Sequence, residues 1–112
     1  MDDLLRPSHP LLSISDALER ATDEWVTALD AEAEAENEYL RKHAVAYARA
    51  AADGVAATMR DKHAQAQPDV VEARCAFNLA AARSKACRAK CQQLESRVNA
   101  SQSYFRLVER QS

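Results

Sequence analysis

The sequence is poor in the residues that make turns: it contains one glycine and three prolines in 112 residues, and aromatic residues make up 5% of it. So few turn formers argue against a sheet built from hairpins. No apolar run approaches the roughly 20 residues of a membrane-spanning helix. The opening segment, MDDLLRPSHPLLS, starts with acids and holds two prolines, which is not the pattern of a signal peptide. We therefore expect the three cysteines to be reduced thiols of a cytoplasmic protein.

The residues that are abundant favour helix. Alanine, glutamate, arginine and leucine are strong helix formers, and their frequency is typical of a long-helix or coiled-coil protein. Hydrophobic residues make up 47% of the chain, but many of them are alanines, which bury little area. A thick core within one molecule is not expected, and we predict a homo-oligomer.

The charges are divided between the two halves of the chain, although the net charge is only −2. Residues 13–53 hold ten acidic and four basic side chains, whereas residues 68–112 hold eight basic and four acidic ones. This asymmetry predicts either pairing between the halves or a basic surface for an acidic partner.

The first helix has sequence signals at both ends. Pro7 and Pro10 predict an irregular arm over residues 1–12. The arm has four leucines that could contact a partner protein: Leu4, Leu5, Leu11 and Leu12. Ser13 and Asp16 match a capping box, which predicts a helix over 14–53. Gly54 is the expected C-cap, because glycine enters the left-handed conformation without a Cβ penalty.

The inner face of this first helix is predicted from residues that recur every three or four positions. They are Leu18, Trp25, Leu29, Ala33, Glu36, Leu40, Ala44, Tyr47 and Ala51. We expect Trp25 to pack against Val98, Phe105 or a neighbouring subunit.

Two more helices are predicted, over 55–66 and over 68–110, the latter led by Pro68 at the favoured first helical position. The last helix has an a/d heptad seam, which serves as hairpin core or oligomer interface. One row of the seam is Val70, Phe77, Ser84, Cys91, Val98 and Phe105. The other row is Ala73, Ala80, Cys87, Leu94, Ser101 and Val108.

Together these elements predict an all-α fold: one domain over 13–112, a long antiparallel, coiled-coil-like hairpin with a short middle helix. With residue 52 placed beside residue 70, the acids of LDAEAEAENEY face residues 84–90. Two interpretations of the bases stay open, pairing with the first helix or contact with nucleic acid. These bases are Arg83, Lys85, Arg88, Lys90, Arg97 and Arg106. Tyr104 and Phe105 are the only aromatic residues near them.

Catalytic and metal chemistry are not expected. Cys87 and Cys91 share a helical face, but both fall on the seam, where a thiol packs as a small hydrophobe. The carboxylates lie on an exposed helix without a glycine-rich loop or a pocket-forming topology. We predict no enzyme activity, cofactor, metal, small-molecule substrate or membrane association.

Two segments, EYLRKHAVAYARAAADG and PDVVEARCAFNLAAARSKACRAKCQQLESRVNASQSYFR, resemble small helical proteins of tailed bacteriophages. The similarity is to recombination mediators of the UvsY type and covers about two thirds of the chain from residue 38 onward. It implies ring-like homo-oligomers that load a recombinase on single-stranded DNA, with Arg97 and Arg106 as DNA contacts. The net acidity departs from the pattern of a dedicated DNA binder.

Three hypotheses for function follow. The first is a phage accessory protein of DNA recombination or replication that binds single-stranded DNA and a partner such as a recombinase in the host cytoplasm. The second is an interaction module that inhibits or adapts a host protein through its acidic helix or leucine-rich arm. The third is that DAEAEAENE mimics nucleic-acid charge and blocks a host nuclease, which requires these acids to remain exposed.

Overall fold

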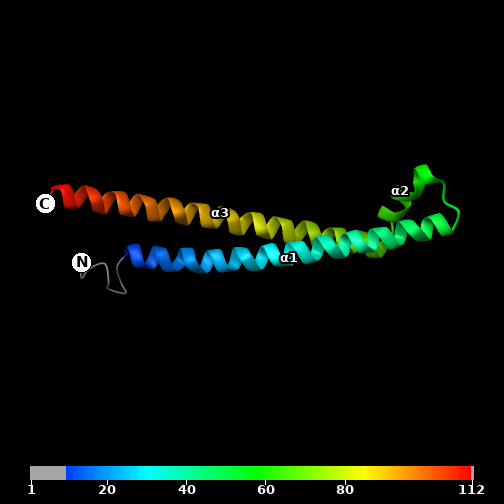
Figure 1. The fold of residues 1–112 in the computed structure, drawn as a ribbon, viewed down its shortest axis with the longest axis horizontal. Helices are drawn as coiled ribbons and strands as arrows, with labels where there is room; N and C mark the ends of the chain where they lie inside the picture. Colours follow the sequence, from blue (N-terminus) through cyan, green and yellow to red (C-terminus); the bar gives the residue numbers. More distant parts are fainter. Residues whose placement is uncertain (1–9, 112) are drawn as a thin grey trace. The chain divides into compact units, whose positions relative to one another are not determined.

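The computed structural model describes the backbone of residues 10–111 and the side chains of residues 12–111. The fold is all-α, a long antiparallel helical hairpin with short helical segments in its connection (Figure 1). Its elements are α1 (Pro10–Ala52), the 3-10 helix η2 (Ala57–Met59), α2 (Arg60–Gln65) and α3 (Pro68–Gln111). This architecture confirms the fold class expected from the sequence.

The start of α1 differs from the prediction. The helix begins at Pro10, so Ser13 and Asp16 lie inside it and do not form a capping box at its start. Proline is favoured at the first helical position, because its missing N–H would have no partner there and its φ is already helical. Residues 10–12 of the irregular arm expected over 1–12 are therefore helical.

The end of α1 is a Schellman motif at Gly54, as the sequence predicts. Gly54 has φ +82°, and it has the only positive φ among the described residues. The Val55 N–H donates to the Ala50 carbonyl at 2.9 Å, and the Gly54 N–H donates to the Ala51 carbonyl at 3.2 Å. These two bonds satisfy carbonyls that the helix end would otherwise leave without partners.

The connection between the two long helices contains less helix than the sequence predicted for residues 55–66. It contains η2 and the six-residue α2, and the Arg60 side chain donates from Nε to the Val55 carbonyl at 2.9 Å. The second long helix, α3, starts at Pro68, as predicted, with Asp69 in its first turn.

The chain divides into two compact units. The central unit is residues 28–84, and the terminal unit is residues 1–27 with 85–112. The core of the central unit is the cluster of Ala46, Ala64 and Val70, with Tyr39 packed against it. This cluster contains one residue from α1, one from α2 and one from α3, so the connecting segment is part of the core.

A chain of hydrogen bonds joins the same three helices in the central unit. The Tyr39 hydroxyl accepts from Gln65 Nε2 at 2.7 Å, and Gln65 Oε1 accepts from the Arg74 guanidinium at 2.9 Å. The Tyr39 ring also stacks on Phe77, with centroids 6.2 Å apart. Because the partners come from separate helices, these contacts fix the register of the unit.

That register corrects the placement expected from the sequence. Val70 lies against Ala46, six positions before the expected residue 52, because α2 packs over the end of α1. With Tyr39 on Phe77, the acids at 32–38 run along residues 78–84, where Arg83 is the only base. The expected facing of acids at 32–38 with bases at 84–90 is therefore wrong.

The terminal unit has its own core of Ala21, Cys91 and Leu94. Leu18 and Trp25 pack against this cluster, which corrects the expected contact of Trp25 with Val98 or Phe105. Along α3, every seam position is buried or half-buried except Val108, which is exposed in the last four residues of the helix.

The inner face of α1 is shifted by about one position from the prediction. The buried residues are Ala21, Ala28, Ala46 and Ala50, and Tyr39 is half-buried. The expected core residues of the middle of α1 are exposed: Leu29, Ala33, Glu36, Leu40, Ala44 and Tyr47. Alanine side chains let two helices approach closely, so the larger residues of α1 lie outside the seam.

Candidate nucleic-acid interface

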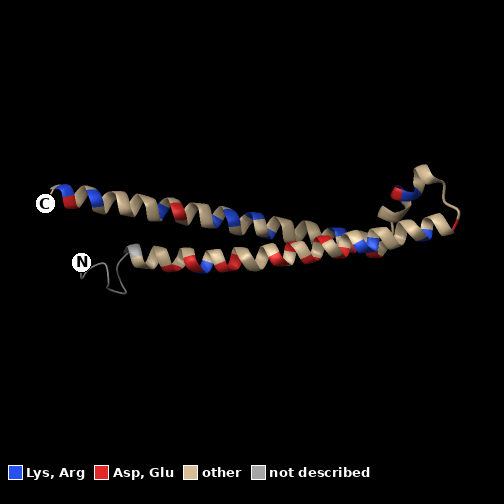
Figure 2. Cartoon of the chain, viewed as in Figure 1, with Lys and Arg blue, Asp and Glu red and all other residues tan. Residues whose placement is uncertain are grey.

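The basic side chains of the terminal unit lie on the outer surface of α3. Cys91 and Leu94 face the core, and the bases before Cys91 and after Leu94 are exposed to solvent. The exposed ones are Lys85, Arg88, Lys90, Arg97, Arg106 and Arg110. Figure 2 shows the contrast between this basic stretch of α3 and the more acidic α1. Arg83 is exposed too, but it belongs to the central unit.

Almost all of these bases lack an acidic partner within residues 10–111. Lys90 Nζ lies 3.5 Å from Glu24 Oε2, and both side chains are well exposed. No other ion pair among the described residues joins α1 to α3. Of the two interpretations that the sequence left open, pairing of most of the bases with the first helix is therefore not observed among the described residues, and the shifted register is the reason.

Lys90, Arg97 and Tyr104 follow one another at steps of seven, so they lie along the same side of α3. Tyr104 is 66% exposed, and its ring meets the half-buried Phe105 edge-on with centroids 6.1 Å apart. Ala100 and Ser101 complete a shallow hollow beside the two rings. Chemically, this side offers cations for phosphate oxygens and one exposed ring on which a base could stack.

The seam residues proposed as core or oligomer interface have mostly inward positions. Phe77 stacks on Tyr39, Ser84 and Cys91 are buried, and Cys87, Val98 and Phe105 are half-buried. Leu94 is buried in the terminal core.

Most of the leucine-rich arm lies outside the residues that the structure describes. Leu4 and Leu5 lie outside the described residues, as does the side chain of Leu11. Leu12 is half-buried on the first turn of α1.

The thiols do not assemble into a site. All three cysteines are free: Cys75 is exposed, Cys87 half-buried and Cys91 buried. Across residues 10–111, no group of three or more His, Cys, Asp or Glu side chains is placed to hold a metal. Within the same residues, no helix is long and apolar enough to cross a membrane.

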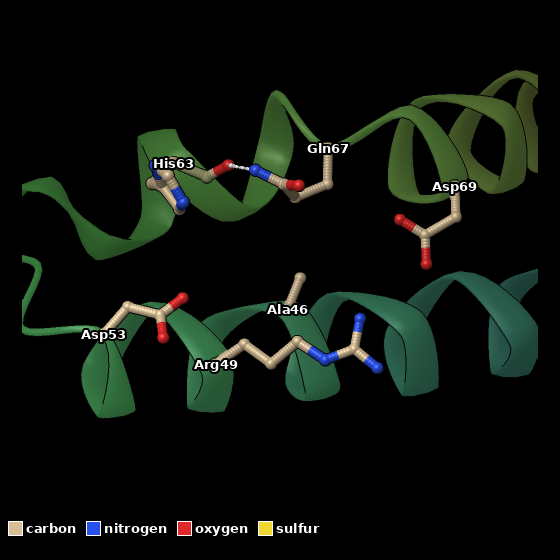
Figure 3. Close-up of a pocket in the computed structure, with 6 residues that line it drawn as sticks. All are labelled: Ala46, Arg49, Asp53, His63, Gln67 and Asp69. Atoms are coloured by element: carbon tan, nitrogen blue, oxygen red, sulfur yellow. Dashed lines mark hydrogen bonds between the residues drawn. The ribbon is translucent and has the colours of Figure 1, made fainter.

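A small polar pocket in the central unit was not anticipated from the sequence. It has a volume of about 80 Å³ and lies where the end of α1 meets α2 and the start of α3. Its lining residues are Ala46, Arg49, Asp53, His63, Gln67 and Asp69 (Figure 3). Gln67 Nε2 donates to the His63 carbonyl at 3.1 Å and ties the loop to α2.

The pocket carries both signs of charge and has no nucleophile of the Ser or Cys type in its lining. Its residues come from three separate elements, so their proximity depends on the fold of the connection. The only local signals were the polar residues flanking Gly54 and Pro68, which are equally typical of helix ends.

Comparison with known proteins adds no relative: no family model, curated protein or solved structure matches this chain.

Proposed function

We propose that this chain is a non-enzymatic accessory protein that binds single-stranded DNA through α3 of the terminal unit. The observation that carries the proposal is the set of exposed bases on that helix that have no carboxylate partner among the described residues. This set includes Lys85, Arg88, Arg97 and Arg106. Cations in water contribute little to the stability of the fold, so their concentration on one helix favours a role in binding an anionic polymer.

DNA affinity of this kind depends steeply on salt. Each phosphate contact to a single strand contributes about 0.7 to the slope of log K against log salt. Four such contacts give a slope of about −3. The exposed Tyr104 would add base stacking, which tolerates any sequence.

The test is fluorescence anisotropy of a labelled oligo-dT, titrated with the protein from low to physiological salt. We expect Arg97→Glu with Arg106→Glu to abolish binding at physiological salt and to flatten the salt slope. The control, Arg41→Glu with Lys62→Glu, changes the net charge equally but lies in the central unit. Equal losses in both variants would mean that only net charge matters, and no binding by the wild type at low salt would refute the proposal.

The resemblance to phage recombination mediators extends this proposal. It supports a phage-encoded, self-associating protein whose second partner is a recombinase. A faster rate of recombinase loading on protein-coated DNA, when this chain is added, would support this extension of the proposal. The Arg97→Glu, Arg106→Glu variant should then lose that acceleration.

A second candidate function is a protein-interaction module that inhibits or adapts a host protein. It is favoured by the acids of α1, since Glu34 and Glu36 are exposed and form no ion pair within residues 10–111. Mimicry of nucleic-acid charge requires exposed acids, and Asp30, Glu34 and Glu36 meet this condition. Glu32 is half-buried, and Glu38 pairs with Arg41 and Lys42. Replacing Glu34 and Glu36 with glutamine should then abolish binding to a positively charged host protein while leaving oligo-dT binding intact.

A further inference from the structure

Lys90 is the exception among the exposed bases of the terminal unit, because an acidic side chain of α1 lies beside it. The Lys90 Nζ atom lies 3.5 Å from Glu24 Oε2, and the two side chains are 58% and 60% exposed. Among the described residues this is the only ion pair that joins α1 to α3. The basic surface of α3 is therefore not fully open to an anionic ligand, since one of its cations already has a counter-ion from the same chain.

Glu24 reaches α3 because it lies at the edge of the core of the terminal unit. Ala21 of α1 is part of the cluster that includes Cys91, and Trp25 packs against this cluster. Glu24 lies three residues after Ala21 and directly before Trp25, so its side chain leaves α1 beside the packed face. Lys90 has the corresponding position on α3, directly before Cys91. The pair therefore follows from the register of the two helices.

The other acids of α1 in this unit do not reach the bases of α3. Asp16, Glu19 and Asp23 are exposed and form no ion pair within residues 10–111. Glu19 precedes Glu24 by five residues, which is a rotation of about 140° around a helix with 3.6 residues per turn. Within residues 10–27, Glu24 is therefore the one carboxylate that neutralises a base of α3.

We propose that Glu24 competes with DNA for Lys90, so that the free protein withholds one cation of its DNA-binding surface. The inference rests on the proposed binding of single-stranded DNA by α3. A phosphate that contacts Lys90 must first displace the Glu24 carboxylate, and the strength of the displaced ion pair is subtracted from the affinity for DNA. Exposed ion pairs are weak, so a strand can open this one.

The position of the pair makes this competition relevant to the side of α3 that carries the exposed aromatic ring. Lys90, Arg97 and Tyr104 lie along the same side of the helix, at steps of seven. While Glu24 holds Lys90, only Arg97 of these two bases is available to a phosphate beside the ring. Displacement of Glu24 raises that number from one to two.

The size of the effect follows from the strength of an exposed ion pair. Such a pair contributes at most about 1 kcal/mol, which is about five-fold in an equilibrium constant. Removal of the Glu24 charge should therefore tighten DNA binding by about three- to five-fold. Salt screens exposed charges, so the gain should be largest at low ionic strength and should shrink toward physiological salt.

The experiment is fluorescence anisotropy of labelled oligo-dT at low salt, with Glu24→Gln compared to the wild type. The matched control is Glu19→Gln, which changes the net charge equally on the same helix and in the same unit. We expect the three- to five-fold gain for Glu24→Gln and a clearly smaller gain for Glu19→Gln. Circular dichroism at 222 nm checks that both variants keep their helix content.

A double-mutant cycle tests whether Glu24 acts through Lys90. In a Lys90→Gln background the partner is missing, so the addition of Glu24→Gln should change the affinity for DNA no more than Glu19→Gln does. The full gain without Lys90 would overturn the proposal, because it would mean that Glu24 repels the strand directly.

The inference and the function on which it rests fail in different ways. If the wild type binds oligo-dT and the two glutamine variants show equal gains, DNA binding stands and the role of Glu24 is refuted. If neither the wild type nor Glu24→Gln binds oligo-dT at low salt, DNA binding by α3 is refuted, and the role of Glu24 with it.

Discussion

Truncation of Val70 gives a direct measure of how much the core of the central unit contributes to stability. Val70 is 0% exposed, and it is the largest fully buried side chain among the described residues. Val70→Ala removes two methyl groups, worth about 1.6 kcal/mol at about 0.8 kcal/mol each. A cavity that does not collapse adds to that loss.

Helix propensity acts in the opposite direction, because alanine is better than valine in a helix by up to about 0.6 kcal/mol. The net destabilisation expected for Val70→Ala is therefore about 1.5–2.5 kcal/mol. The matched control is Val45→Ala in α1 of the same unit, where the side chain is 48% exposed. There the smaller burial loss and the propensity gain nearly cancel, giving a change of about 0–0.5 kcal/mol.

The assay is urea unfolding followed by circular dichroism at 222 nm, with both variants and the wild type at one protein concentration. The reasoning requires a clear separation between the two valines. Equal midpoints for Val70→Ala and Val45→Ala would refute it, because they would mean that the Ala46–Ala64–Val70 cluster is not a core.

Two further predictions follow from local geometry. Gly54→Ala should destabilise the chain by about 1–2 kcal/mol in the same urea assay. An added Cβ meets no atom within 4 Å, so the whole penalty comes from the positive φ of 82°. Gly54→Asn should be less destabilising, and a Gly54→Ala variant as stable as the wild type would contradict the αL cap. A thiol reagent added to the native protein should modify Cys75 at once and Cys91 only after denaturant is added, because Cys75 is exposed and Cys91 is buried. Mass spectrometry of the labelled peptides measures this difference. Fast labelling of Cys91 in the native protein would contradict the core of the terminal unit.

The features that the sequence predicts well are the ones with a local physical cause. Gly54 ends α1 because the αL position there requires no Cβ, and Pro68 starts α3 because the first helical N–H needs no partner. The seam of α3 was also predictable, because a seven-residue repeat that includes Val70, Cys91 and Leu94 has only one way to face a neighbouring helix.

The inner face of α1 was not predictable from hydrophobicity, because size and burial are inverted on this helix. Leu40 and Tyr47 are exposed, while Ala28, Ala46 and Ala50 are buried. A search for hydrophobic periodicity gives most weight to the large residues, and it therefore selects the exposed face of α1. The seam instead uses alanines, which allow close approach to the small residues of α3.

The register of the two long helices was missed for a related reason. The position of Val70 beside Ala46 depends on how α2 packs, and no repeat in α1 or α3 encodes it. An error of six positions then placed the acids of α1 beside the bases of α3, which made pairing between them one of the two interpretations of the basic run. The polar pocket depends on the same connection, so its residues could not be grouped from their spacing.

The inversion on α1 has a consequence for stability that can be measured. Alanine side chains bury little area, so a core built from Ala21, Ala46 and Ala64 contributes little of the apolar burial that holds small domains together. The large side chains of α1 that could supply it, Leu29, Leu40 and Tyr47, are exposed. If the predicted homo-oligomer covers them, association and folding are coupled, and mass action makes the thermal midpoint rise with protein concentration. Thermal unfolding of the wild type at micromolar and at hundred-fold higher concentration should show this rise, and Leu40→Glu should remove it. An unchanged midpoint across that range would mean that the alanine core is sufficient by itself.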